Sequence, residues 1–222
     1  MIGALLLALL AYVPSSDLLL KRAAARVNVG GRSKEVTLSG TLSLKGEQPR
    51  SAQLVLRFPF SCKLEGEGGL ALSVKGPTET AGSDTPAARL LQLACPLVAY
   101  RGMRADEAEQ ALRAAAISFG ADLNASPSLS RLVDRVAYVL GAPAHDLGRP
   151  QLWLYKDSHA PARLIVGGAD LRLLQYGNPA AAEWFPRVLE LWIDGQLASR
   201  FEVLEARGMR FTGEEEEYSR PE

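Results

Sequence analysis

The side chains best suited to acid–base chemistry in this chain are its two histidines, His145 and His159. They lie in the hydrophilic stretches PAHDLG and KDSHAP, which are typical of turns. His145 precedes Asp146, and a His–Asp pair could act as a general base in hydrolysis. Adjacent residues on a turn do not point at each other, however, and no Ser or Cys stands in a nucleophile-elbow motif. We therefore predict that the protein is not an enzyme, and a hydrolase built on His145 and Asp146 is the third functional hypothesis.

The glycines and carboxylates give no better indication of catalysis. Glycines at positions 30, 31, 66, 68 and 69 lack the GxGxxG and GK[ST] spacings with which loops bind phosphate. Aspartates and glutamates are scattered, without the spacing of a calcium loop or a carboxylate pair. The sequence therefore predicts turn glycines, no catalytic residues, no metal site and no cofactor.

Cys62 and Cys95 are the only cysteines, and both lie in apolar, strand-like surroundings. Neither has a CxxC neighbour or a nearby His, so thiol chemistry and a zinc site both lack their usual spacing. An even number of cysteines in an exported chain favours a disulfide. The Cys62–Cys95 bond would close a loop of about 33 residues and contribute a few kcal/mol. Two buried free thiols are the alternative.

Composition limits the class of protein and the class of partner. Hydrophobic residues make up 47% and charged residues 23% of the 222 residues, which is typical of one folded domain. Because 25 basic residues balance 25 acidic ones, the chain has no net field to attract a polyanion. Nucleic acid is therefore not expected as a partner, and we expect a monomer.

The first residues form an apolar run that ends at Pro14. Its length suits the hydrophobic region of a signal peptide and is short of the roughly 20 residues that span a bilayer. Residues 1–14 are therefore predicted to be a signal peptide or a short N-terminal anchor, which implies a periplasmic, exported protein. No Lys or Arg precedes the run, and a buried N-terminal helix is the alternative.

Strict alternation of apolar and polar residues over 35–45 is the strongest local signal of secondary structure. Successive side chains of a strand point to opposite faces, so this pattern predicts a half-buried antiparallel strand. Residues 53–60 alternate again after a turn, and the two strands should pair as a hairpin. The other predicted strands are 63–67, 70–75, 151–155, 163–166, 171–176, 188–193 and 196–204.

Helices are predicted at two places and left open at two others. Ser16 can cap a helix that carries Asp17 in its first turn and ends near Asn28, and residues 105–116 form an alanine-rich helix. Residues 87–98 are apolar, but Pro96 argues against a continuous helix there. Residues 129–140 fit both a helix and a strand. The stretch 76–86 has the composition of a loop.

The fold class that follows is mainly β (α+β). About nine strands with short turns suggest a curved antiparallel sheet that forms an open (unclosed) barrel, covered by an N-terminal helix and one or two inserted helices. Residues 15–212 would make one such domain. Residues 213–222 form an acidic tail without apolar periodicity, which is typical of disorder.

Large apolar residues on the predicted strands are the feature that could bind a ligand. The simplest interpretation is that they fill the core. A sheet that curls can instead leave an apolar cavity, and such cavities hold small hydrophobic ligands. The cavity candidates are Leu54, Leu56, Phe58, Phe60, Trp153 and Trp192.

The chain also resembles the LolA/LolB-type lipoprotein-sorting superfamily. An apolar leader and an amphipathic first helix precede a meander that opens with V-x-L-x-G-x-L, at residues 36–42. The stretch LRFPF, residues 56–60, is similar to the family's basic residue followed by a proline and an aromatic. A second stretch resembles the family's W-x-dx(K/D)…P-x-R hairpin, and its matching positions are Trp153, Lys156, Asp157, Pro161 and Arg163.

The resemblance implies an unclosed barrel with a helical lid and an apolar cavity for the acyl chains of a lipid or lipoprotein in the periplasm. The family's strand arginine, which ties the lid to the barrel, would correspond to Arg57, although alternation points Arg57 away from the cavity side. The leading hypothesis is therefore a non-enzymatic carrier, with envelope membrane proteins as further partners. The alternative is an envelope sensor or protein-interaction module of the same fold with no ligand cavity.

Overall fold

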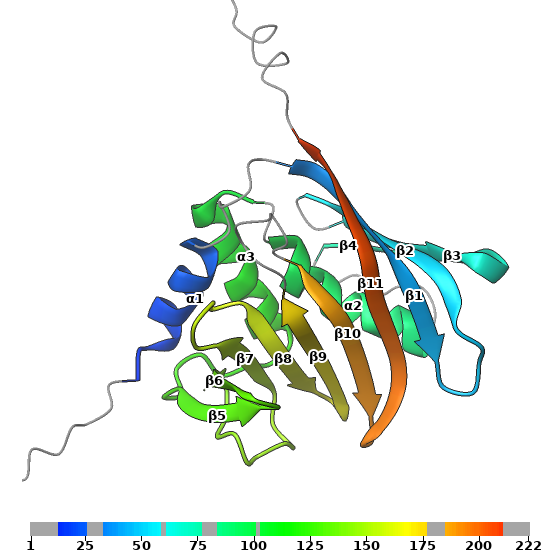
Figure 1. Ribbon diagram of the computed structural model, residues 1–222. Helices are drawn as coiled ribbons and strands as arrows, with labels where there is room; N and C mark the ends of the chain where they lie inside the picture. The colour runs from blue at the N-terminus through cyan, green and yellow to red at the C-terminus, as the bar shows by residue number, and fades with distance from the viewer. Residues whose placement is uncertain are drawn as a thin grey trace, which may run out of the picture.

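The protein folds around one large antiparallel sheet with helices on one of its faces (Figure 1). The computed structural model describes residues 13–25, 33–58, 61–76, 84–100, 103–176 and 185–210. The predictions for the leader 1–12, for Phe60 and for the tail 213–222 lie outside these residues. No helix among the described residues is long and apolar enough to span a bilayer.

Eleven strands form the sheet in the order β4-β3-β2-β1-β11-β10-β9-β8-β7-β6-β5, with no pairing between β4 and β5 among the described residues, so it is an unclosed barrel as predicted. The strands are β1 (Ser33–Leu44), β2 (Arg50–Arg57), β3 (Ser61–Gly66), β4 (Leu70–Lys75), β5 (Ser128–Leu132), β6 (Arg135–Leu140), β7 (Gln151–Tyr155), β8 (Pro161–Val166), β9 (Ala169–Tyr176), β10 (Pro186–Ile193) and β11 (Gln196–Arg210). A 3-10 turn, η2 (Glu67–Gly69), joins β3 to β4.

The alternation that predicted β1 determines which of its residues meet the helices. Val36, Leu38 and Leu42 are buried on the inner face. The predicted hairpin with β2 is confirmed by continuous pairing that starts at Glu35 and Arg57 and ends at Leu42 and Arg50. Gly40 also lies on this face, where a Cβ atom would stand 2.0 Å from the backbone oxygen of Glu202. Position 40 therefore needs glycine, because β11 approaches too closely at the register shift there.

Helix α2 (Pro86–Ala99) lies against the inner face of the sheet, so the expectation that Pro96 prevents a continuous helix is wrong. A proline deletes one backbone hydrogen bond, and Pro96 stands in the last turn of a helix whose burial offsets that loss. The helix begins after Thr85, whose side chain accepts the N–H of Ala88 at 3.2 Å.

Helices α1 (Ser16–Ala25) and α3 (Ala105–Ser118) pack against each other beside α2. Their contact consists of small and aliphatic side chains, among them Leu19 and Leu112, and a salt bridge joins Arg113 to Asp17 at 2.6 Å. The cap of α1 is Ser15, whose hydroxyl accepts the N–H of Leu18, and not Ser16 as predicted. Ser16 is instead buried in the first turn.

The ambiguous segment 129–140 is a hairpin of two strands, β5 and β6. Leu132 pairs with Arg135 across the two-residue turn Val133–Asp134. The segment is therefore not a helix, and its two strands bring the sheet to more strands than the nine expected. Strands β9 to β11 are also longer than predicted.

Candidate binding site

The predicted cavity residues on β2 lie on the inner face, against the helices. Leu54 and Leu56 are buried in the large apolar cluster that the sheet forms with α2, which we call the inner core. Phe58 is half-buried and packs at the margin of this cluster. These three residues are therefore together, as alternation predicted.

The predicted tryptophans lie on the opposite face of the sheet. Leu152 and Leu154 of β7 belong to the inner core, so Trp153 between them points outward. Trp192 alternates in the same way with Leu191 on β10. The structure thus does not bring the two tryptophans to the same side as Leu54 and Leu56, and any ligand role of the full set remains a prediction.

The space between sheet and helices contains most of the side chains of α2. Eleven of its fourteen residues are buried, and Leu91, Leu93 and Leu97 are among the largest fully buried side chains. Helix α2 is therefore a core helix and not a surface lid. Partly buried side chains surround the inner core; they are Val13, Leu44, Phe58, Leu70, Leu72, Met103, Phe119, Leu123, Val166, Tyr176 and Ile193.

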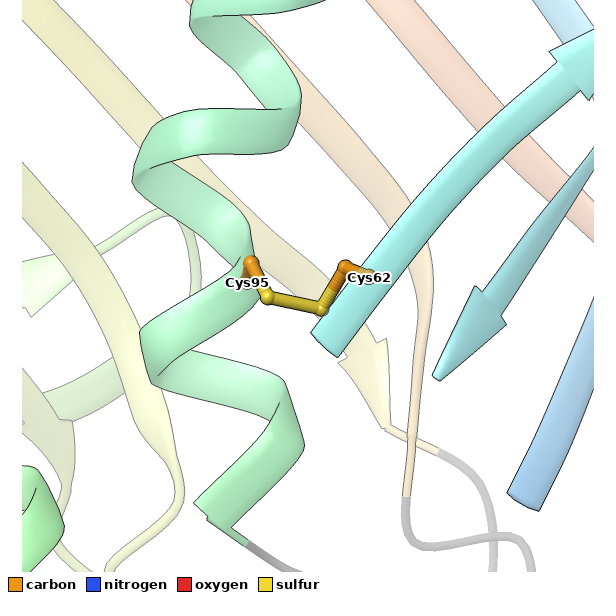
Figure 2. Close-up of a disulfide and its surroundings, with 2 residues drawn as sticks. All are labelled: Cys62 and Cys95. Carbon is orange, nitrogen blue, oxygen red and sulfur yellow. A yellow bond between two sulfur atoms is a disulfide. The ribbon is translucent and has the colours of Figure 1, made fainter. Parts of the chain in front are cut away.

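A disulfide between Cys62 and Cys95 fastens α2 to strand β3, as Figure 2 shows. The predicted bond is confirmed, with a separation of 5.9 Å between the Cα atoms. The predicted surroundings hold for Cys62 only, because Cys95 lies on a helix and not in a strand. A buried disulfide fits a protein that folds in an oxidising compartment.

The outer face of β5 to β8 carries a second apolar cluster, and a charged layer lies beside it on β8 and β9. Trp153 is the centre of the cluster, which consists of Leu132, Ala137, Val139, Trp153, Tyr155, Ala160 and Ala162. The Trp153 indole donates to Gln151 Oε1 at 2.8 Å. The Gln151 amide in turn donates to the carbonyls of Pro143 and Asp146, so it holds the loop after β6 in place.

We call the charged layer the arginine triad, which consists of Arg163, Asp170 and Arg172. Arg163 donates to both oxygens of Asp170, at 2.7 and 2.8 Å, and Arg172 donates twice to Asp170 Oδ2, at 3.1 and 2.8 Å. The two guanidinium groups also stack on aromatic rings, Arg163 on Trp153 and Arg172 on Trp192. The triad therefore links outer side chains of four adjacent strands, β7 to β10.

Burial and charge shift two pKa values in this region. Burial opposes ionisation of Asp170, but the hydrogen bonds and charges of Arg163 and Arg172 outweigh it and lower its pKa. Burial raises the pKa of Tyr155 to about 12. The Tyr155 hydroxyl donates to the carbonyl of Leu173, so it has a structural role on the outer face.

Arg57 lies on the outer face, where it is bonded to Glu35. Its side chain is 70% exposed, on the side of the sheet that faces away from the helices. The structure thus places it away from α2, and its role as a lid contact remains a prediction that this position does not support.

The two histidines lie in different surroundings. His145 is exposed in the loop after β6, and His159 is buried beside Tyr138, with 6.0 Å between ring centroids. His159 was expected in a hydrophilic turn. It does follow a turn, but its imidazole ring is buried. Within the described ranges no group of three His, Cys, Asp or Glu side chains could hold a metal ion.

Sequence reasoning missed the arginine triad, although its signal was present. Arg172 stands between Leu171 and Leu173, which alternation places on the buried face, so Arg172 and Asp170 had to lie on the other face. The pairing of β8 with β9, which places Arg163 opposite Arg172, is the information that the sequence lacked.

Comparison with known proteins identifies the fold. No family model matches the chain, and no curated protein matches it. Among solved structures, a putative outer membrane lipoprotein-sorting protein domain from Vibrio parahaemolyticus has a TM-score of 0.50 at 12% identity, covering 90% of this chain and 94% of that one. A LolA superfamily protein from Nitrosomonas europaea has a TM-score of 0.48 at 13% identity, covering 91% and 97%. The resemblance stated from the sequence is therefore confirmed at the level of the fold.

Proposed function

We propose that this protein is a non-enzymatic binding protein of the cell envelope that holds the acyl chain of a lipid or lipoprotein between its sheet and its helices. The observation that carries the proposal is the continuous inner core of a curved, unclosed sheet, in a fold shared with a lipoprotein-sorting domain. The disulfide supports an exported protein. Residues 1–14 would then be a signal peptide or an anchor, and the protein would act as a monomer with envelope membrane proteins as further partners.

An acyl chain would enter at the margin of the inner core. Phe58 lies there, directly after β2, half-buried and in contact with the core. Each methylene that leaves water stabilises the complex by about 0.8 kcal/mol, so a long chain can offset the displacement of some contacts of α2. The disulfide keeps the C-terminal part of α2 on β3, which limits the displacement to the N-terminal part of the helix.

Native mass spectrometry of the full chain, purified from an envelope fraction, tests this proposal. We expect bound species with acyl-chain masses, and binding of a fluorescent fatty acid by the delipidated protein. Phe58→Glu should weaken that binding, whereas Val55→Glu, on the outer face of β2, should not. A protein that is empty and does not bind the fatty acid would refute the carrier function.

A second candidate is a protein-interaction or sensor module with a packed interior. The observation that favours it is the burial of α2, whose leucines already occupy the inner side of the sheet. This candidate predicts a folded protein that carries no ligand, and the same mass spectrum separates the two.

A further inference from the structure

The sheet ends at β5, and the free edge of this strand exposes both an aliphatic and a charged side chain. In the described part of the chain, β5 pairs with β6 alone and is the last strand of the sheet. Leu129 is 41% exposed there and Arg131 is exposed beside it. The edge thus presents an aliphatic side chain and a guanidinium on one face of a strand that is paired on one side only.

The register of the hairpin shows which backbone groups of β5 point away from β6. Leu132 and Arg135 flank the two-residue turn, and the residues of such a pair exchange hydrogen bonds. Hydrogen-bonded and non-hydrogen-bonded pairs alternate along an antiparallel ladder. Leu129 and Arg131 therefore direct their N–H and C=O groups toward the open edge.

The turn that ends β5 is strained in a way that packing does not require. Val133 has φ of 56° and is 76% exposed. A β-branched side chain is disfavoured in this region, where glycine or asparagine is the ordinary residue. An exposed valine held in an unfavourable conformation, at the end of the strand that carries the exposed Leu129, is more readily understood as a contact residue than as a stabilising one.

We propose that β5 binds an extended segment of a partner protein, which adds to the sheet as a further strand and carries an acidic residue opposite Arg131 between two apolar residues. Arg131 makes its hydrogen bond to the carbonyl of Asp134 at 3.4 Å and has no carboxylate partner among the described residues. An added strand would supply that carboxylate, and its backbone would pair with Leu129 and Arg131. Its apolar side chains would lie beside Leu129 and Val133.

A second copy of the chain fits this edge less well. Antiparallel self-pairing about Ser130 would place Arg131 of each copy opposite Leu129 of the other. The guanidinium groups would then gain no carboxylate, and only five residues of each strand would pair. The edge is therefore better matched to a foreign acidic segment than to itself.

Selection of a phage-displayed library of random linear peptides on the full chain tests this proposal. We expect enriched peptides with an acidic residue flanked at alternate positions by apolar ones. A synthetic peptide with the core Val-Thr-Glu-Thr-Val should slow hydrogen exchange at the amides of Leu129 and Arg131. Arg131→Glu should weaken its binding about tenfold, as loss of a charged hydrogen bond does. Arg149→Glu, at an exposed loop position, is the matched control.

Backbone pairing has its own test. Leu129→Pro removes an outward N–H, and N-methylation of the peptide at alternate residues removes the same bonds without altering the protein. Both should abolish binding. No enrichment, binding unchanged by Arg131→Glu, or binding insensitive to N-methylation would each overturn the proposal. Self-association in ultracentrifugation that Leu129→Pro removes would overturn it in favour of a second copy. Fatty-acid binding by the same variants reports separately on the acyl-chain function.

Discussion

The two halves of the sheet are stabilised in different ways. In β2 the residues alternate between buried and exposed, so the outer face of β1 to β4 is open to water. All five residues of β7 are buried, because its outer face is covered by the cluster around Trp153. The half with one covered face is the half that the disulfide joins to α2. The comparison indicates that a covalent bond stabilises the half of the sheet in which only one face is buried, whereas packing on both faces stabilises the other half.

Trp153→Ala should have the largest effect on stability, because it empties the centre of the outer cluster. Truncating a buried aromatic side chain costs about 3–5 kcal/mol, and here Gln151 Oε1 also loses its donor. The free energy of unfolding from urea titrations measures the loss. Trp192→Ala is the control, since Trp192 is only partly buried. Equal losses for the two variants would show that the outer cluster does not stabilise β7.

Replacing both cysteines, Cys62→Ala with Cys95→Ala, should lower the free energy of unfolding by about 3–4 kcal/mol. The estimate follows from the entropy of an unfolded chain that no longer carries a cross-link over 33 residues. Hydrogen exchange should accelerate in β2 to β4 and α2 and stay slow in β7 to β10. Uniform acceleration across the sheet would contradict the assignment of the disulfide to one half.

Asp170→Asn should cost about 1–2 kcal/mol, because Arg163 and Arg172 lose the carboxylate between them. Thermal unfolding together with urea titration measures it. Glu202→Gln is the control, since it removes a carboxylate bonded to Arg200 at an exposed site. If both variants lost the same small amount, the triad would be no stronger than a surface ion pair.

The same carboxylate gives a pH dependence of known sign. The pKa of Asp170 is lower in the folded protein than its ordinary value of 3.8. Its contribution to stability is therefore complete above that value and is lost as the pH falls through the lower, folded-state pKa. The difference in unfolding free energy between the wild type and Asp170→Asn should be constant at neutral pH and shrink only in acid. A difference that shrinks near pH 6 would mean that another group is responsible.

Most of the first half was predictable from the sequence because its strands have one buried face. The alternation around Leu38 and Leu54 specifies both the strand and the side that meets the core. Strand β7 was predicted from its composition alone, since a strand buried on both faces has no alternation. The sequence could therefore not say that Trp153 and Leu54 point to opposite sides.

The errors have physical causes that local patterns do not contain. Pro96 is tolerated because the rest of α2 is buried, which is a tertiary property. The 129–140 segment fits two periods, and pairing with β7 selects the strand. The disulfide was predictable from the cysteine count, but the position of Cys95 on a helix was not. The arginine triad depends on cross-strand register, which a single sequence does not give.

The exposed ion pair between Arg57 and Glu35 should matter least. Arg57 is 70% exposed on the open face of β2, where water screens the charges and side-chain entropy opposes the contact. Arg57→Ala should therefore change the free energy of unfolding by less than about 1 kcal/mol. Fatty-acid binding should be unchanged as well, because the side chain lies on the side of the sheet opposite the inner core. A large loss of either would mean that Arg57 contacts the helices in solution, and the two faces of the first half would then be less distinct than their burial indicates.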